Sequence, residues 1–382
     1  MSLRRNVLFT AGIAAALVLT ACQDQDQPNE PNAPSLGTAR TQDTRFTRGA
    51  ELRGLPPGVR VSDLATPGRV VTPTACDDNT PLSAYFLDRV FEIPLPTLVL
   101  LLNRWTDLVP TYESLLFQTR DRNTYFGYNG EYNRRMDKVE RDVKGFWDIK
   151  SDDIQVLAMH GTVLADPSRT IPTYQSPEFL GLPPAIAQTW AGEVQNVMQT
   201  EPTVNGGNHP LFTFNAFAIS APEIGIPDKI VMGDGILDAY KVIGFDDVAL
   251  PAIFAHEFAH HIQFERGYFD ELPPGSNPAT VNQAELTRYT ELMADALAAY
   301  YLTHKRGATM NAKRVAQFLR VFFEIGDCAF DNPGHHGTPN QRMRAAEFGF
   351  RVADEAQKQG HILTANQFHA RFLTVFPSLV AP

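Results

Sequence analysis

Two histidines four residues apart, with a glutamate next to the first, are the residues of this sequence best suited to chemistry. They are His256, Glu257 and His260, in the stretch AIFAHEFAHHIQFERG that begins at residue 252. On a helix, side chains four residues apart lie on one face, so the two imidazoles can bind one metal ion. The carboxylate of Glu257 can then reach a water molecule held by that metal. This H-E-x-x-H spacing predicts a catalytic zinc site, provided that a third protein ligand exists and one position stays open.

A buried helix that merely contains histidines is the alternative. The H-E-x-x-H spacing arises by chance in roughly one chain of this length in a hundred. The third histidine of the stretch, His261, is rotated off the ligand face, so we expect it at the surface or behind the ligands. A third ligand elsewhere in the chain decides between the two interpretations.

The third ligand is expected from a second helix. A ligand later in the first helix would need glycine at position 263 and histidine at 266, which are Gln263 and Arg266. The segment TRYTELMADALAAYY, residues 287–301, places Glu291 and Asp295 four residues apart. Carboxylates in such an apolar segment are costly to bury unless they are paired or ligated. We therefore predict Glu291 as the ligand and Asp295 as the acceptor that orients a ligating histidine, with a solvated acidic face as the alternative.

Three segments together resemble the bacterial neutral zinc metallopeptidases of the gluzincin type. They are HEFAHHIQ from His256, ELMAD from Glu291 and HGTPNQR from His336. The segment NAFA from Asn215 is similar to the strand region of membrane-linked gluzincins. The resemblance covers roughly residues 212–348, and it departs from the pattern at Ala259, where the neutral metallopeptidases usually have glycine.

The resemblance implies peptide-bond hydrolysis with one Zn²⁺ per chain, held by the two histidines of the motif and by Glu291. Glu257 would be the general base for the metal-activated water. His336 would stabilise the oxyanion, although a capping or packing role is its alternative, and Arg342 would brace the loop that carries it. Asn215 and Ala216 would belong to an edge strand that holds an extended substrate. An aminopeptidase motif of the G-x-M-E-N type is missing, which favours an endopeptidase.

The elements that must position these residues indicate an α+β fold. Of the 382 residues, 43% are hydrophobic, which suffices for a sizeable core. Strand-like segments precede long helical ones, a pattern that favours α+β. Over residues 201–382 we expect a zincin-like domain, with a small antiparallel or mixed sheet packed on long helices. Residues 49–200 are expected to be helix-rich, either as a separate N-terminal part or as part of the same domain. The expected strands are 154–159, 211–220 and 229–232, and the expected long helices are 246–266, 281–305 and 313–325.

Local signals mark the ends of the helix that carries the motif. Asp246 and Asp247 are expected to cap its first turn, because aspartate accepts hydrogen bonds from free backbone N–H groups. Gly267 is expected to end it, because glycine tolerates the left-handed conformation of a helix terminus.

The first 48 residues are expected to be a lipoprotein signal and a tether. Two arginines precede an apolar run, residues 7–19, that is short for a membrane span. The run ends in LTAC, which resembles a bacterial lipobox, so residues 1–21 would be removed and Cys22 lipidated. Residues 22–48 are polar and proline-containing and form a flexible tether. We expect an envelope protein anchored in the outer membrane and facing the periplasm; an ordinary secretory signal is the alternative.

The charge of the chain restricts its partners. Asp and Glu outnumber Lys and Arg by 43 to 33, for a formal net charge of −10. Such a surface repels nucleic-acid phosphates and anionic lipids, so the membrane is reached only through the anchor. A protein or peptide substrate is the expected partner. The competing hypothesis is a non-catalytic lipoprotein with a zincin fold that acts as a binding or envelope-assembly factor.

Two further cysteines, Cys76 and Cys328, follow the tether. In an oxidising compartment they can form a disulfide, and the long loop that it closes would be worth roughly 4–5 kcal/mol in the chain-entropy model. Two unpaired thiols are the alternative, because geometry decides which cysteines can bond.

Overall fold

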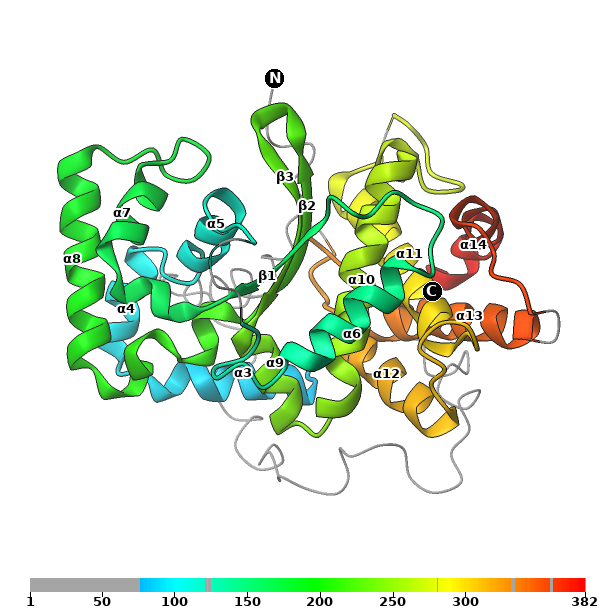
Figure 1. The fold of residues 1–382 in the computed structure, drawn as a ribbon, viewed down its shortest axis with the longest axis horizontal. Coiled ribbons are helices and arrows are strands. Elements are labelled where there is room, and N and C mark those ends of the chain that lie inside the picture. Colours follow the sequence, from blue (N-terminus) through cyan, green and yellow to red (C-terminus); the bar gives the residue numbers. More distant parts are fainter. Residues whose placement is uncertain are drawn as a thin grey trace, which may run out of the picture.

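The fold of this chain is α+β, with helices around one small mixed sheet (Figure 1). The structure is a computed structural model that describes residues 76–381 except 121, 123–124, 280, 331–333 and 358–359. The α+β class predicted from the sequence is confirmed. The predicted signal peptide, the lipidated Cys22 and the tether, residues 1–48, lie outside the described residues. None of the described helices combines the length and the apolar composition that a bilayer-spanning segment needs.

The sheet has the strand order β1-β3-β2. β1 (Gln155–Met159) runs parallel to β3 (Ile226–Gly233), and β2 (Ala216–Ala221) pairs antiparallel with β3. β2 therefore lies at one edge. The strand expected over residues 211–220 is wrong in its first half, where Pro210–Thr213 forms a 3-10 turn. Pro210 has a fixed φ and no N–H to donate to a strand partner, and the N–H of Leu211 is instead capped by the preceding His209 ring.

Helices from the first half of the described chain lie mainly on one side of the sheet (Figure 1). Helix α6 is the exception, because it packs against α10 on the other side. Strand β1 also comes from this half and pairs with β3, so the described residues before position 200 and those after it share a sheet and a core. The helices of this half are α3 (Pro81–Glu92), α4 (Leu95–Asn103), α5 (Val109–Leu116), α6 (Asn133–Lys144), α7 (Pro167–Gln175) and α8 (Pro184–Thr200).

The second half continues with the long helices that the sequence predicts. Helix α10 has the predicted bounds, α11 is two residues shorter than predicted at each end, and α12 begins and ends one residue earlier than predicted. Helix α10 ends at Gly267, which has φ 71° and the left-handed conformation expected of it. The helices are α9 (Asp234–Val242), α10 (Asp246–Arg266), α11 (Gln283–Thr303), α12 (Ala312–Glu324), α13 (Pro339–Gln357) and α14 (Ala365–Leu379).

The predicted cap of α10 is wrong. The cap position is occupied by Phe245, and no side chain makes the capping hydrogen bond. Asp246 lies in the first turn and contacts α6 and its start instead: its Oδ1 accepts from the Tyr132 hydroxyl at 3.1 Å, and its Oδ2 lies 3.2 Å from Arg135 Nη1. The Asp246 carboxylate therefore forms a tertiary ion pair with Arg135 and does not cap the helix, although local sequence rules predict that it does.

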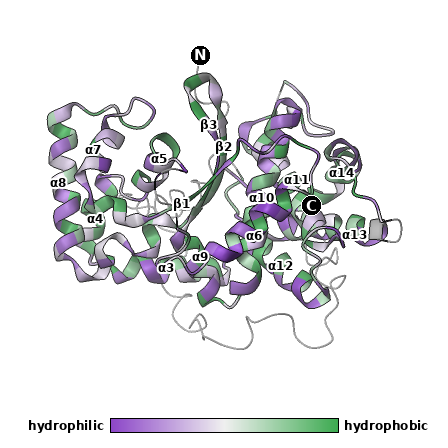
Figure 2. Ribbon diagram, viewed as in Figure 1, coloured by the Kyte–Doolittle hydropathy of each residue, from purple (hydrophilic) through white to green (hydrophobic). Residues whose placement is uncertain are grey.

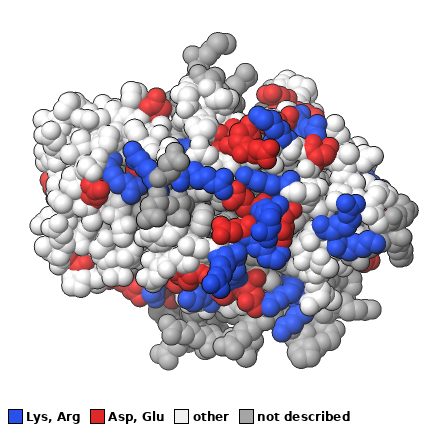
Figure 3. All heavy atoms as spheres, viewed as in Figure 1, with Lys and Arg blue, Asp and Glu red and all other residues white. Residues whose placement is uncertain are grey.

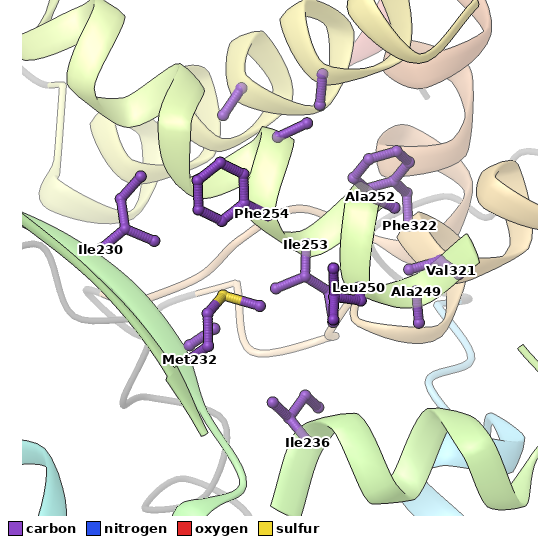
Figure 4. Close-up of a cluster of buried hydrophobic side chains, with 14 of the residues drawn as sticks. Ile230, Met232, Ile236, Ala249, Leu250, Ala252, Ile253, Phe254, Val321 and Phe322 are labelled. Atoms are coloured by element: carbon purple, nitrogen blue, oxygen red, sulfur yellow. The ribbon is translucent and has the colours of Figure 1, made fainter. Parts of the chain in front are cut away.

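One hydrophobic core joins the sheet to the helices (Figure 4). Ile230 and Met232 of β3 face Ile253 and Phe254 of α10, and Ile236 of α9 lies beside them (Figure 4). All five side chains are buried. This packing fixes the position of α10, and with it the face of α10 that points away from the sheet.

Helix α6 carries much of the charge on the face seen in Figures 2 and 3. It is coloured mainly hydrophilic in Figure 2, and Figure 3 shows basic and acidic side chains interspersed over the same region. The ion pairs Lys138–Asp142 and Lys144–Glu140 lie within this helix. Because both signs alternate, they largely offset each other on this face.

Candidate metal centre

Helices α10 and α11 lie side by side and bring the predicted ligands together. Helix α11 begins where Asn282 and Glu285 form a capping box, in which each side chain accepts from the other residue's backbone N–H. A side chain of α10 links the two helices: Gln263 Nε2 donates to the carbonyl oxygen of Thr290 at 2.7 Å. Glu291 is the next residue of α11, so this bond sets the register between the ligand pair of α10 and the carboxylates of α11.

Three side chains converge between these helices. His256 Nε2 lies 3.2 Å from His260 Nε2 and 3.2 Å from Glu291 Oε2. His260 Nε2 lies 3.4 Å from Glu291 Oε1. All three side chains are buried, and the group could hold a metal ion. It is the one such group of three or more His, Cys, Asp or Glu residues in the part of the chain that the structure describes.

The other ring nitrogen of each histidine lies close to a side-chain oxygen. His260 Nδ1 lies 2.8 Å from Gln263 Oε1, which must be the acceptor because the amide nitrogen donates to Thr290. His256 Nδ1 lies 2.9 Å from Asp295 Oδ1. When Nδ1 of each histidine carries the proton, Nε2 of each histidine carries a lone pair. The two lone pairs then point toward each other and toward a carboxylate. Such an arrangement needs a cation at its centre.

In the metal-free chain a proton meets this need. Burial disfavours the charged imidazolium of His256, but the carboxylates of Asp295 and Glu291 outweigh burial and raise the pKa of His256 to about 10. Burial also disfavours the charge of Glu291, yet His336 and His260 outweigh it and hold the pKa of Glu291 well below its usual range. A metal ion that binds here must displace a proton.

Asp295 is held in turn by Arg342, a residue of the first turn of α13. Arg342 Nε donates to Asp295 Oδ2 at 2.8 Å, and Nη2 donates to Oδ1 at 2.7 Å. Both side chains are buried. Burial works against the charge of the guanidinium, but Asp295 and Glu291 raise the pKa of Arg342 above its usual range. The guanidinium of Arg342 orients the carboxylate behind His256, because α13 packs on α11. Its role in bracing the His336 loop stays a prediction.

Glu257 lies beside His256 on α10 with one carboxylate oxygen free. The side chain is buried, and Oε2 has no hydrogen-bond partner. Burial raises the pKa of Glu257, although the neighbouring histidines oppose this. A buried carboxylate with a free oxygen and a raised pKa is suited to accept a proton near neutral pH.

His336 is buried next to the cluster, and neither of its ring nitrogens has a hydrogen-bond partner. Its backbone N–H donates to Asp327 Oδ2 at 2.9 Å. The other oxygen of the same carboxylate, Oδ1, lies 2.6 Å from His335 Nδ1. Asp327 and His335 were not predicted as site residues. Asp327 stands beside a cysteine in a loop-like context, and no spacing in the sequence connects it with the motif.

His261 lies behind the ligands and not at the surface. It is fully buried, and its Nε2 lies 2.9 Å from the carbonyl oxygen of Lys229 in β3. Burial lowers the pKa of His261 to about 4, so the ring is neutral at neutral pH. The surface alternative for this residue is wrong: His261 ties α10 to the sheet.

The predicted substrate strand has two different parts. Ala216 is the first residue of the edge strand β2, which packs against α10. Asn215 precedes the strand and, together with Asp107 and Thr111, lines a small, partly open cavity of about 10 Å³. Asn215 is half-buried, and its Nδ2 has no hydrogen-bond partner among the described residues. The edge position of β2 leaves backbone pairing with a substrate as a prediction.

Cys76 and Cys328 form a disulfide in the structure, with their Cα atoms 5.6 Å apart. The bond joins the start of the described chain to the segment between α12 and α13.

Comparisons of the chain with protein-family models, with curated proteins and with solved structures found no match. The interpretation of the site therefore depends on its geometry and chemistry.

Proposed function

We propose that this protein is a zinc-dependent peptidase with a zincin-like fold of the gluzincin type, and that it hydrolyses peptide bonds with a metal-activated water. The observation that carries the proposal is the convergence of His256 Nε2, His260 Nε2 and the carboxylate of Glu291. The two nitrogens lie 3.2 Å apart, and each lies 3.2 to 3.4 Å from one of the two Glu291 oxygens. A tetrahedral zinc site with ligand bonds of about 2.0–2.1 Å has ligand atoms about 3.3 Å apart, so the spacing fits zinc.

The donor set supports zinc over a hard cation. Two imidazole nitrogens and one carboxylate oxygen suit zinc, whereas calcium and magnesium prefer oxygen ligands alone. The contacts behind the ligands also fit, because a ligating histidine usually directs its other nitrogen at a carboxylate or carbonyl oxygen. Asp295 and Gln263 occupy these positions for His256 and His260.

The side chains around the cluster have the properties that hydrolysis requires. A zinc ion on the three ligands would supply Lewis-acid activation of a water molecule at neutral pH. Glu257, buried with a free oxygen, would take the proton from that water and pass it to the leaving nitrogen. His336, with both ring nitrogens unpartnered, would donate a hydrogen bond to the oxyanion.

A peptide substrate is supported by the edge position of β2. An extended peptide can pair with the free side of an edge strand, and β2 packs on the helix that carries the ligands. We propose internal cleavage of the substrate, by an enzyme anchored through Cys22 to the outer membrane of a bacterial envelope and facing the periplasm.

The test compares Glu257→Gln with Glu265→Gln in the zinc-loaded protein. Glu265 lies on the exposed face of the same helix, so it controls for the chemical change itself. Glu257→Gln should lower the rate of hydrolysis of a mixed peptide library by about 10²–10⁴-fold or more, because an amide cannot accept the proton. Zinc content should stay near one per chain in both variants. Full peptidase activity in Glu257→Gln would rule out the proposed mechanism.

The burial of the whole cluster favours one second candidate. Because the three ligands and Glu257 are nearly inaccessible, the metal could serve stability alone, in a non-catalytic envelope protein. This candidate predicts that a chelator lowers the melting temperature while wild-type protein cleaves no peptide in the library. Hydrolysis that disappears in Glu257→Gln would exclude it.

A further inference from the structure

The segment between α12 and α13 connects the disulfide to the metal cluster. We propose that Asp327 is a positioning residue for His336 and that the Cys76–Cys328 disulfide holds Asp327 in place, so that full activity depends on the oxidised bridge. This inference rests on the proposed function, because it assigns a role to His336 in the reaction.

Asp327 makes polar contacts with three consecutive residues, His335, His336 and Gly337. Its Oδ1 lies 2.6 Å from His335 Nδ1, and its Oδ2 accepts from the His336 backbone N–H at 2.9 Å. Its own backbone N–H donates to the carbonyl oxygen of Gly337 at 3.0 Å. Asp327 is largely shielded from water, yet the two histidines keep its pKa below the usual range of an aspartate, so the carboxylate is ionised when it accepts these bonds.

These three residues lie directly against α11. Gly337 has φ +102°, and a Cβ atom there would come within 3.2 Å of Leu292 Cδ2. Leu292 follows the ligand Glu291 in the chain. The His336 ring makes no hydrogen bond within the described residues, but its Nδ1 lies 3.4 Å from Asp327 Oδ2. Its backbone N–H is bound to the same oxygen, so the position of the ring depends on Asp327. A shift of this carboxylate would therefore move the imidazole relative to the cluster.

The disulfide fixes the other side of Asp327. Cys328 is the next residue, and its bond to Cys76 ties it to the segment that precedes α3. The same segment is joined to the end of α12 by two hydrogen bonds: Thr80 Oγ1 donates to the Glu324 carbonyl oxygen at 3.1 Å, and Leu82 N–H donates to Glu324 Oε2 at 3.0 Å. Beside the disulfide, the Cys328 N–H also donates to Asp78 Oδ2 at 3.4 Å. Asp327 therefore stands between attachments on both sides, at Glu324 and at Cys328, to the segment at residues 76–82.

Reduction of the bridge removes one of these attachments. Two electrons from a phosphine reductant and two protons from water convert the S–S bond into two thiols, and the phosphine becomes its oxide. The hydrogen bonds to Glu324 remain, so the fold around α12 keeps its contacts while Asp327 loses the covalent support beside it. The metal ligands lie on α10 and α11, outside the released segment, and should keep their metal.

The experiment uses the zinc-loaded full chain and its metal-free form. Two changes, Asp327→Asn and the double change Cys76→Ser/Cys328→Ser, are each made in wild type and in His336→Ala. In wild type, each should lower kcat/KM by about 10–100-fold, the usual effect of losing a residue that orients an active-site group, with zinc content unchanged. In His336→Ala, each should change kcat/KM by less than about twofold, because the group that they position is gone.

Amide hydrogen exchange supplies a readout that needs neither zinc nor substrate. In the metal-free protein, the His336 N–H should exchange at least about tenfold faster in both changed proteins, because its bond to a charged acceptor is weakened. Wild type treated with the phosphine should match the double serine protein, and the double serine protein should not respond to the phosphine.

Three results would overturn the inference. They are additive losses in the His336→Ala background, zinc loss in Asp327→Asn, and unchanged exchange at His336. If wild type binds no zinc or cleaves no peptide, the proposed function fails, independently of this inference. The rate of amide exchange at His336 then still decides whether Asp327 and the disulfide hold this segment.

Discussion

Two of the regions in which a histidine meets a carboxylate differ in how many groups converge. Between α10 and α11, two imidazole nitrogens lie 3.2 Å apart, and each lies 3.2 to 3.4 Å from one oxygen of the Glu291 carboxylate. At the end of the sheet, His160 Nδ1 lies 2.5 Å from Asp234 Oδ2, and the ring of Tyr125 stacks on His160 at 4.2 Å. The first region collects lone pairs that need a cation, and the second contains a single histidine–carboxylate contact, with His160 Nε2 and Asp234 Oδ1 left without a hydrogen-bond partner among the described residues.

The scaffold explains the difference. His160 and Asp234 each follow one of two parallel strands, in which Met159 is paired with Gly233. Each strand end contributes one residue, so this position yields a pair. Two adjacent helices contribute residues four apart on facing sides, so they can direct several ligand atoms into one volume. Proximity of histidine and carboxylate does not define a metal site; the number of converging lone pairs does.

The largest effect on zinc affinity and activity is expected from a change in a metal ligand. Glu291→Gln removes the anionic member of the cluster, so metal affinity and activity should fall together, by more than the roughly 10–100-fold typical of residues behind a ligand. Zinc affinity is measured by competition with a chelator. Glu285→Gln is the matched control in the same helix, because glutamine also serves in the capping box of Asn282. Equal zinc affinity in both variants would remove Glu291 from the ligand set.

A smaller effect on zinc affinity is expected from a change in Asp295, which contacts the ligand His256. Asp295→Asn should weaken zinc binding by about 10–100-fold, because the amide orients His256 less well. It also removes the charge that Arg342 contacts with two hydrogen bonds and leaves this buried guanidinium with Glu291 Oε2 at 3.5 Å, which should lower the free energy of unfolding by about 3 kcal/mol. Urea denaturation of the metal-free protein measures this second effect separately. A variant that loses neither affinity nor stability would show that the Asp295–Arg342 pair does not support the cluster.

The smallest effect is expected in the second region. His160→Gln should leave zinc content and peptidase activity at wild-type levels, because His160 belongs to no ligand cluster. The free energy of unfolding should fall by about 1–3 kcal/mol, since Asp234 would keep its buried carboxylate without the imidazole. Loss of zinc in this variant would contradict the distinction drawn between the two regions.

The sequence predicts those residues of the site that are identified by their spacing within one helix. The spacing of His256 and His260 specifies one helical face, and two carboxylates in an apolar helix identify Glu291 and Asp295. The converging atoms of His256, His260 and Glu291 agree with that prediction. Gly267 ends α10 as expected, because the left-handed terminus depends only on that residue.

Contacts between distant segments could not be predicted in the same way. The partner of Arg342 depends on how α13 packs on α11, and the role of Asp327 depends on a disulfide between residues separated by 252 positions. Asp246 was assigned to a helix cap because the local rule does not include the ion pair with Arg135. Each of these differences arises where a long-range contact replaces a local one.

The zinc content of the purified wild-type chain tests the central claim most directly. The protein is loaded with zinc, dialysed against buffer free of metal, and analysed by mass spectrometry for metal per chain, beside the variant His256→Ala/His260→Ala. The convergent cluster predicts about one zinc per wild-type chain and almost none in the variant. Wild type without bound zinc, or a variant that keeps it, would contradict the account.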